Sequence, residues 1–257
     1  MLLAIDSGNT NVVFAVYDGA ERRGIWRIAT EARRTSDEYA VWLLQLMAMA
    51  KLKQADITDA IIASVVPTAT FNLIRLCQHH FDCTPLEIGA PGVDLGVGVK
   101  LDSPGDVGAD RLVNAVAARE ILDPPLIVVD FGTATTFDIV DGEGDYCGGV
   151  IAPGINLSIE ALHRAAAKLP KVEVARPKNV IGKSTIGAMQ SGIFWGYVGL
   201  VEGLVGRIKA EYGAPMHVLA TGGLAPLFSA ATDQIEAIDG ELTMRGLVRI
   251  FERNRKT

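Results

Sequence analysis

Two short segments of this chain combine an aspartate, a glycine two residues later and several small hydroxyl or amide side chains. The first is Asp6-Ser7-Gly8-Asn9-Thr10-Asn11, and the second, near the midpoint of the 257 residues, is Asp130-Phe131-Gly132-Thr133-Ala134-Thr135. Glycine permits a tight turn and lets a ligand approach the backbone closely. Successive N–H groups in such a turn form a concave site for anions. The repeat therefore predicts phosphate binding, with one turn from each half of the chain facing the phosphate.

The carboxylate of Asp6 would repel a phosphate unless a cation lies between them. Asp6 therefore indicates Mg²⁺, bound directly or through water. The alternative is an ordinary β-turn, in which Asp and Asn serve turn propensity alone. The second copy, from Asp130 to Thr136, favours phosphate binding, because chance agreement of two independent turns is rarer than that of one.

A third candidate segment, Gly108-Ala109-Asp110-Arg111, stands where a helix is expected to begin. A helix N-terminus favours negative charge, so Asp110 can be read simply as a stabiliser of the first turn. Asp followed by Arg also supplies a base for a hydroxyl group and a clamp for a carboxylate or phosphate. Both interpretations remain open at this point.

The elements that position these segments follow the same order in both halves of the chain. Strands in hairpin order come first, and alternating helices and strands follow. Thr35 and Glu38 have the spacing of a capping box, which places a helix start at Ser36. The pattern predicts an α/β protein with mixed β-sheets flanked by helices, in two domains, residues 1–122 and 123–257. The expected strands are residues 2–5, 12–17, 25–29, 60–65, 86–88, 126–130, 135–140, 148–151 and 217–221, and the expected helices are residues 36–52, 67–80, 108–122, 155–167, 186–212 and 242–253.

Composition excludes several classes of function. The chain is 49% hydrophobic and 21% charged, with a formal net charge of −6 and no basic block, which argues against nucleic acid as a main partner. Residues 184–201 are uncharged and near the length of a bilayer span, but polar residues and glycines interrupt them, so no membrane partner is expected. The cysteines lack the paired spacing of zinc ligands, which favours free thiols and a cytoplasmic location. They are Cys77, Cys83 and Cys147.

A row of small residues runs along the expected helix 186–212. Each interior glycine costs about 0.5–1 kcal/mol relative to alanine, so the row indicates that another helix backbone approaches closely. We expect this approach at or beside a dimer interface; the alternative is a helix that packs flat on its own sheet. The small residues recur at steps of three or four, which places them on one helical face. They are Ala188, Gly192, Gly196, Gly199, Gly203, Gly206, Ala210 and Gly213.

In their order and spacing, residues 6–11, 108–111 and 130–133 resemble the type III pantothenate kinases. Three more groups of motifs match the same family, so the resemblance covers essentially the whole chain. These are Gly148-Gly149 with Ile151-Ala152-Pro153-Gly154, Gly182-Lys183-Ser184-Thr185 with Gln190-Ser191-Gly192, and Thr221-Gly222-Gly223. The resemblance implies two duplicated ribonuclease-H-like domains, as in the actin-like ATPases and the actin/hexokinase/Hsp70-like kinases. It also implies ATP-dependent phosphorylation of pantothenate to 4'-phosphopantothenate, the first step of coenzyme A biosynthesis.

The same resemblance implies roles for individual residues. Asp110 is the catalytic base that accepts the hydroxyl proton. Asp130 binds a monovalent cation, K⁺ or NH₄⁺, and Asp6 serves the Mg²⁺ that accompanies ATP. The implied pantothenate-binding residues are Gly108, Ala109, Asp110, Arg111 and Thr185. The implied ATP-binding residues are Asp6, Ser7, Gly8, Asn9, Thr10, Asn11, Val12, Val13 and Thr133.

One position departs from the family pattern. Leu101 stands where the family often has a tyrosine, and leucine cannot donate a hydroxyl hydrogen bond.

The resemblance further implies a homodimer. Two other functions stay open: an actin-like nucleotide-binding regulatory or assembly protein, and a superfamily kinase for another small alcohol. The first would need no acceptor pocket, so Asp110 and Arg111 with Thr185 argue against it.

Overall fold

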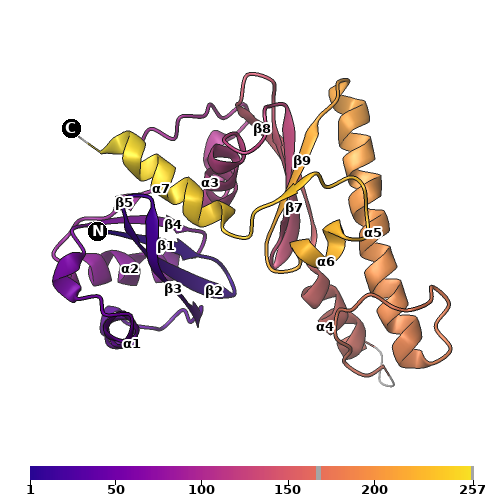
Figure 1. Ribbon diagram of the computed structural model, residues 1–257, viewed down its shortest axis with the longest axis horizontal. Helices are drawn as coiled ribbons and strands as arrows, with labels where there is room; N and C mark the ends of the chain where they lie inside the picture. Colours follow the sequence, from indigo (N-terminus) through magenta and orange to yellow (C-terminus); the bar gives the residue numbers. More distant parts are fainter. Residues whose placement is uncertain (166–168, 256–257) are drawn as a thin grey trace. The chain divides into compact units, whose positions relative to one another are not determined.

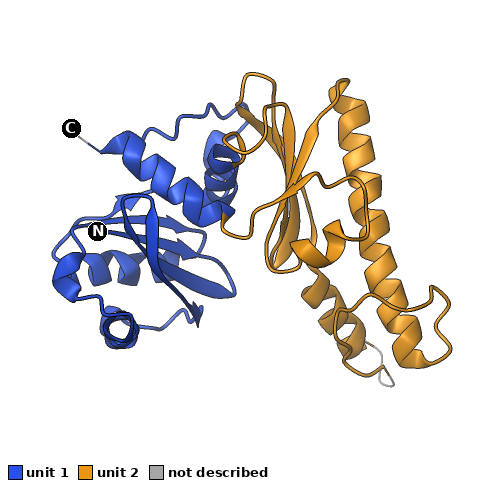
Figure 2. Ribbon diagram, viewed as in Figure 1, with its two compact units in different colours: residues 1–117, 242–257 blue, residues 118–241 orange. Residues whose placement is uncertain are grey.

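The computed structural model describes residues 1–165 and 169–255, which form two units (Figures 1 and 2). Unit 1 comprises Met1–Ala117 and the segment that begins at Leu242, and unit 2 is Ala118–Glu241. The predicted division into residues 1–122 and 123–257 differs from these units mainly at the C-terminal helix.

That helix, α7 (Leu242–Asn254), belongs to unit 1 and not to the second half of the chain. Its buried Leu247 and Ile250 lie in one hydrophobic cluster with Leu2 and Ala4 of the first strand. The assignment of residues 242–253 to a C-terminal domain is therefore corrected, because the apolar face of this helix is buried against the first sheet. The expected end of that domain, residue 257, lies outside the described residues.

Each unit contains one five-stranded mixed sheet. The order is β3-β2-β1-β4-β5 in unit 1 and, read in the same sense, β8-β7-β6-β9-β10 in unit 2. In both sheets the first three strands of the unit run antiparallel to their neighbours, and the last two are added in parallel. The duplicated strand order confirms the predicted α/β class with two mixed sheets.

All predicted strands and helices are present, with ends that differ by a few residues. The strands are β1 (Leu2–Ser7), β2 (Asn11–Asp18), β3 (Glu21–Ala29), β4 (Asp59–Ser64), β5 (Leu86–Glu87), β6 (Leu126–Phe131), β7 (Ala134–Val140), β8 (Tyr146–Pro153), β9 (His217–Thr221) and β10 (Ala237–Ile238). The other helices are α1 (Ser36–Met49), α2 (Pro67–His80), α3 (Ala109–Ala118), α4 (Ile155–Ala165), α5 (Thr185–Tyr212), α6 (Ala225–Ser229) and the short 3-10 helices η1 (Gln54–Asp56) and η2 (Pro104–Asp106). The sequence did not predict β10, α6, η1 or η2.

Local chemistry explains where helix α1 begins and ends. The Glu38 N–H donates to Thr35 Oγ1 at 3.3 Å, and the Thr35 N–H donates to Glu38 Oε2 at 2.7 Å, so the predicted capping box is present. The hydrogen bond from the Thr35 backbone lowers the pKa of Glu38. Lys51 has a φ of 61°, which ends the helix before the predicted residue 52.

Two other predicted helix ends also need comment. Helix α3 stops at Ala118 and not at residue 122, because the N–H groups of Ile121 and Leu122 both donate to the Ala118 carbonyl in a closing turn. The predicted end of α4 at Ala167 lies outside the described residues.

Alternation along β1 separates the two faces of the unit 1 sheet. Leu3 and Ile5 are buried in the cluster that includes residues of α1 and α2. Leu2 and Ala4 are buried on the other face, with Val113 of α3. Because side chains alternate along a strand, Asp6 lies on the same face as α3.

Unit 2 repeats this arrangement around β6. Ile127 and Val129 face a cluster that contains Phe194 and Val201 of the long helix α5. By the same alternation, Asp130 lies on the opposite face of the sheet from α5. Helix α5 begins where the Gly187 N–H donates to Ser184 Oγ at 3.1 Å.

None of the described helices has both the length and the apolar character required to cross a bilayer.

The contact between α3 and α7 supplies a test of this packing. A Cβ atom built on Gly246 would overlap the Val113 carbonyl oxygen and lie 2.7 Å from Val113 Cγ1. Gly246→Ala should therefore lower the free energy of unfolding by about 1–3 kcal/mol, despite the better helix propensity of alanine. Urea unfolding measures the change. Gly240→Ala, where a Cβ would meet nothing within 4 Å, is the control, and equal stability of the two variants would contradict the packing.

Candidate functional site

The two Asp-X-Gly segments form turns of the same kind at corresponding places in the two sheets. The Gly8 N–H donates to the Asn11 carbonyl at 3.0 Å, and the Gly132 N–H donates to the Ala134 carbonyl at 3.0 Å. Each turn links the first two strands of its unit. Residues 9–11 and 132–133 are exposed, so both turns present polar groups at the surface of their own unit.

The strand register shows how far the repeat extends. Asp6 is paired with Val13, whereas Asp130 is paired with Thr136. The second turn is therefore one residue shorter than the first. The two carboxylates nevertheless occupy the same place, next to the last residue of the first strand of each unit.

In unit 1 the structure brings the first turn and the predicted acceptor segment together. The Val65 N–H donates to the Ser7 carbonyl at 3.1 Å. A Cβ atom built on Gly108 would lie 3.3 Å from Val65 Cγ1 and 2.6 Å from Asp110 Oδ1. Val65, which the sequence did not single out, therefore links residues 6–11 to residues 108–111. Gly108 has no side chain, and this leaves the space into which the Asp110 carboxylate turns.

Asp110 lies in the first turn of α3, on the face of the sheet that Asp6 also faces. Burial raises the pKa of its carboxyl group, and the backbone N–H and positive charge of Arg111 oppose this shift. The Arg111 N–H donates to Asp110 Oδ1 at 2.9 Å. A half-buried carboxylate with a raised pKa is a stronger base than an exposed one.

In unit 2 two glycines surround the second turn. A Cβ atom built on Gly222 would lie 2.8 Å from Asp130 Oδ1 and 2.6 Å from the Phe131 carbonyl oxygen, and the φ of Gly222 is 90°. A Cβ atom on Gly154 would overlap the Thr133 carbonyl oxygen. The sequence assigned no role to Gly154 or Gly222. Both lie in motifs that match the family, but their role depends on contacts between segments that are distant in the chain, and the motifs do not show such contacts.

The oxygen atoms around Asp130 are of the kind that bind a cation. The Asp130 carboxylate and the Phe131 carbonyl both lie beside the position that a side chain on residue 222 would fill. Carboxylate and carbonyl oxygens are the ligands that hard cations prefer, and carbonyl oxygens coordinate K⁺. The residues present therefore fit the implied monovalent cation.

Two other residues discussed for pantothenate, Thr185 and Leu101, lie in other segments of the chain. Thr185 is exposed and is the first residue of α5 in unit 2, next to Ser184, which caps that helix. Leu101 is half-buried in the loop between β5 and η2 in unit 1. Unit 1 thus contains Asp6, Asp110 and Leu101, and unit 2 contains Asp130, Thr133 and Thr185.

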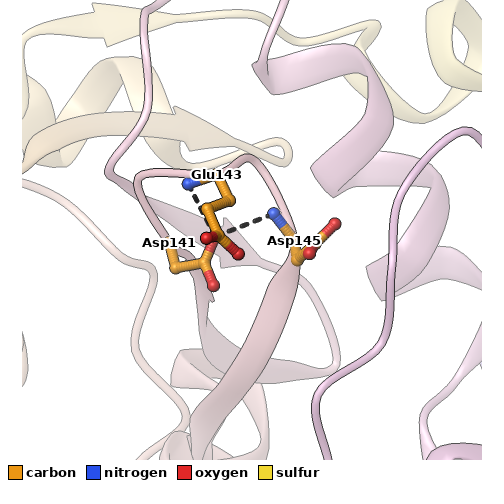
Figure 3. A group of neighbouring side chains, drawn as sticks. All are labelled: Asp141, Glu143 and Asp145. Carbon is orange, nitrogen blue, oxygen red and sulfur yellow. Dashed lines mark hydrogen bonds between the residues drawn. The ribbon is translucent and has the colours of Figure 1, made fainter.

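An acidic group outside the predicted set shapes the turn between β7 and β8 (Figure 3). Asp141, Glu143 and Asp145 lie close together, and Asp141 Oδ1 accepts the N–H groups of Glu143 at 2.9 Å and Asp145 at 3.0 Å. The guanidinium of Arg119 packs against Gly144 of the same turn. These contacts explain the three carboxylates as parts of a turn.

Comparison with known proteins gives the same family over nearly the whole chain. Residues 2–207 match the protein family described as type III pantothenate kinase. The type III pantothenate kinase of Rhodospirillum rubrum is 65% identical over 254 residues, which cover 99% of each chain. That of Paramagnetospirillum magneticum is 64% identical over 254 residues, which cover 99% of this chain and 98% of the relative. The chain belongs to the type III pantothenate kinase family.

Solved structures of more distant proteins share the fold. A Baf family protein from Campylobacter jejuni aligns with a TM-score of 0.62 at 18% identity, over 98% of both chains. The ethanolamine utilization protein EutJ from Carboxydothermus hydrogenoformans aligns with a TM-score of 0.54 at 16% identity, over 96% of this chain and 88% of EutJ. At these identities the likeness concerns the fold alone.

The raised pKa of Asp110 predicts a pH-dependent effect on stability. The folded protein favours the protonated carboxyl, so the contribution of this group to stability should be greatest below the ordinary value of 3.8 and decline as the pH rises through the raised pKa. Asp110→Asn imitates the protonated form and should raise the free energy of unfolding at neutral pH. Urea unfolding at a series of pH values measures this gain, with the exposed Asp106→Asn as control. A gain that does not shrink in acid would contradict the assignment.

Proposed function

We propose that this chain transfers the terminal phosphoryl group of ATP to the primary hydroxyl of pantothenate, forming 4'-phosphopantothenate. Membership of the type III pantothenate kinase family supports the reaction. The structural observation that carries the proposal is the arrangement in unit 1. There, Val65 links an exposed, glycine-containing turn with Asp6 to a half-buried Asp110 at the start of a helix.

The proposed roles of the side chains follow from what phosphoryl transfer requires. The reaction depends mainly on positioning and on neutralising charge, because its transition state has little covalent bonding to the protein. Asp110 aligns the hydroxyl group and accepts its proton late in the transfer. Gly108, Ala109, Arg111 and Thr185 are assigned to pantothenate, and the guanidinium of Arg111 suits its carboxylate.

The turns are assigned to ATP and its cations. Residues 6–13 and Thr133 bind ATP, through backbone N–H groups and small polar side chains. Asp6 serves Mg²⁺, directly or through water, and Asp130 binds K⁺ or NH₄⁺. When bound, these cations neutralise phosphate charge. Leu101 offers no hydroxyl donor, so any contact it makes with pantothenate is apolar.

A coupled assay with ATP and pantothenate, with and without K⁺, tests the reaction directly. Mass spectrometry of the acceptor identifies the product. We expect a phosphomonoester of pantothenate and little turnover without K⁺ or NH₄⁺. Absence of pantothenate phosphorylation under both conditions would defeat the proposal. Hydrolysis of ATP alone would favour a nucleotide-binding regulatory protein, and phosphorylation of a different alcohol would favour another kinase of the superfamily.

Asp110→Asn separates binding from chemistry. The amide keeps the shape of the side chain but cannot accept the hydroxyl proton, so kcat should fall by about 10²–10⁴. Isothermal titration should show nearly unchanged ATP affinity. Asp106→Asn, an exposed carboxylate on η2, is the matched control and should retain turnover. Full activity of Asp110→Asn would remove the residue from its proposed role.

We also propose that the enzyme is a homodimer in which the glycine face of α5 lies at or beside the interface. Cβ atoms built on Gly192, Gly196, Gly199 and Gly206 would meet nothing within 4 Å. The face of α5 that packs on the sheet of its own unit is a different one, with Phe194 and Val201. Helix α5 thus packs on the sheet of its own unit through this other face, and the open glycine row supports the proposal that a second backbone approaches there.

Leucine at the centre of this row tests the interface. Gly199→Leu places a large side chain where a second backbone would approach, and it should raise the dimer dissociation constant at least about tenfold, which corresponds to about 1.4 kcal/mol. Light scattering after size-exclusion chromatography measures the mass. Glu211→Leu, also exposed on α5, is the control. An unchanged mass and melting temperature in Gly199→Leu would refute the interface.

A further inference from the structure

Thr30, the residue that follows β3, makes two hydrogen bonds to the first turn. Its side-chain hydroxyl donates to the Gly8 carbonyl at 2.6 Å. Its backbone N–H donates to the Thr10 carbonyl at 2.9 Å. A single residue outside the Asp6–Asn11 motif therefore holds two of the carbonyl groups of that motif.

Holding a carbonyl also fixes the N–H of the next residue. The peptide bond is planar and trans, so its C=O and N–H groups point in opposite directions. The Gly8 carbonyl, bound by the Thr30 hydroxyl, shares its peptide with the Asn9 N–H. The Thr10 carbonyl likewise shares its peptide with the Asn11 N–H. The Asn9 N–H is therefore directed away from the Thr30 hydroxyl on an exposed turn, where a phosphate can meet it. The Asn11 N–H is directed away from β3, toward the β1 side of the hairpin.

The corresponding position in unit 2 is held in a different way. Ala29 is paired with Asn11, and Pro153 is paired with Ala134. The next residues, Thr30 and Gly154, are therefore structural counterparts. Gly154 packs its backbone directly on the Thr133 carbonyl, leaving no room for a side chain. Unit 2 thus supports its turn by close backbone contact, whereas unit 1 uses a hydroxyl group.

We propose that Thr30 is a positioning residue for ATP, whose hydroxyl fixes the Gly8–Asn9 peptide so that the Asn9 N–H meets a phosphate oxygen. This inference rests on the proposed assignment of residues 6–13 to ATP. Thr30 itself touches no substrate. Its contribution is the orientation of a backbone donor.

The pair Thr30→Val and Thr30→Ser tests the hydroxyl against its matched removal. Valine keeps the shape and loses the donor, whereas serine keeps the donor. Loss of one positioned hydrogen bond should raise the KM for ATP about five- to tenfold in Thr30→Val. The KM for pantothenate should stay unchanged, and Thr30→Ser should remain within about twofold of wild type. Thr232→Val removes a comparable hydroxyl hydrogen bond, to Glu202 in unit 2, and should leave the KM for ATP unchanged.

Thermal melting distinguishes positioning from folding. MgATP should raise the melting temperature of wild type and Thr30→Ser equally and that of Thr30→Val less. If Thr30→Val does not fold, Thr30→Ala is measured in the same way. An unchanged KM for ATP in the folded variant, an equal rise in both KM values, or failure of serine to retain function would overturn the role of Thr30 while leaving the kinase proposal intact. Inactivity of the wild type would instead overturn the kinase proposal.

Discussion

The hydrogen bonds from the Gly8 N–H to the Asn11 carbonyl and from the Gly132 N–H to the Ala134 carbonyl close the turns on which the site residues depend. Each bond sharply reverses the chain directly after a buried strand. The strand before the turn is fixed by its neighbours on both sides, so the aspartate near its end has a defined face. A neighbouring segment contacts each turn. At the first turn the contacts are the hydrogen bonds of Thr30 and Val65, and at the second they are the close backbone approaches of Gly154 and Gly222.

The surroundings of the two turns differ, although their backbones correspond. The first turn has the Thr30 hydroxyl, which holds the Gly8 carbonyl, and it is linked through Val65 to the segment that carries Asp110. In the second turn, Gly222 packs against Asp130 and the Phe131 carbonyl, and Gly154 packs against the Thr133 carbonyl. The Asn9 N–H that Thr30 orients favours a phosphate anion, whereas the carboxylate and carbonyl oxygens beside Gly222 favour a cation. This difference supports the proposed division of roles between Asp6 and Asp130, and it distinguishes two copies that the sequence presents as nearly equal.

Local patterns predicted much of this structure. The presence of the strands, the capping box of Thr35 and Glu38, and the correspondence of Asp6 with Asp130 all depend on neighbouring residues, which a sequence displays directly. Contacts between distant segments could not be derived in this way. The apolar face of α7 is compatible with either sheet, so only the packed structure shows that it joins unit 1. The same limit applies to Val65 and Gly222, and to Lys51, whose left-handed conformation ends α1.

The proposed division of roles is that the two similar turns serve different ions. A crystal structure with a non-hydrolysable ATP analogue, Mg²⁺ and Rb⁺ in place of K⁺ tests it most directly, because Rb⁺ is located by its anomalous scattering. We expect an Rb⁺ peak at coordinating distance from the Asp130 carboxylate, and Mg²⁺ with the phosphates on the Asp6 side. An Rb⁺ peak at Asp6, or none at Asp130 under conditions in which K⁺ supports turnover, would contradict it.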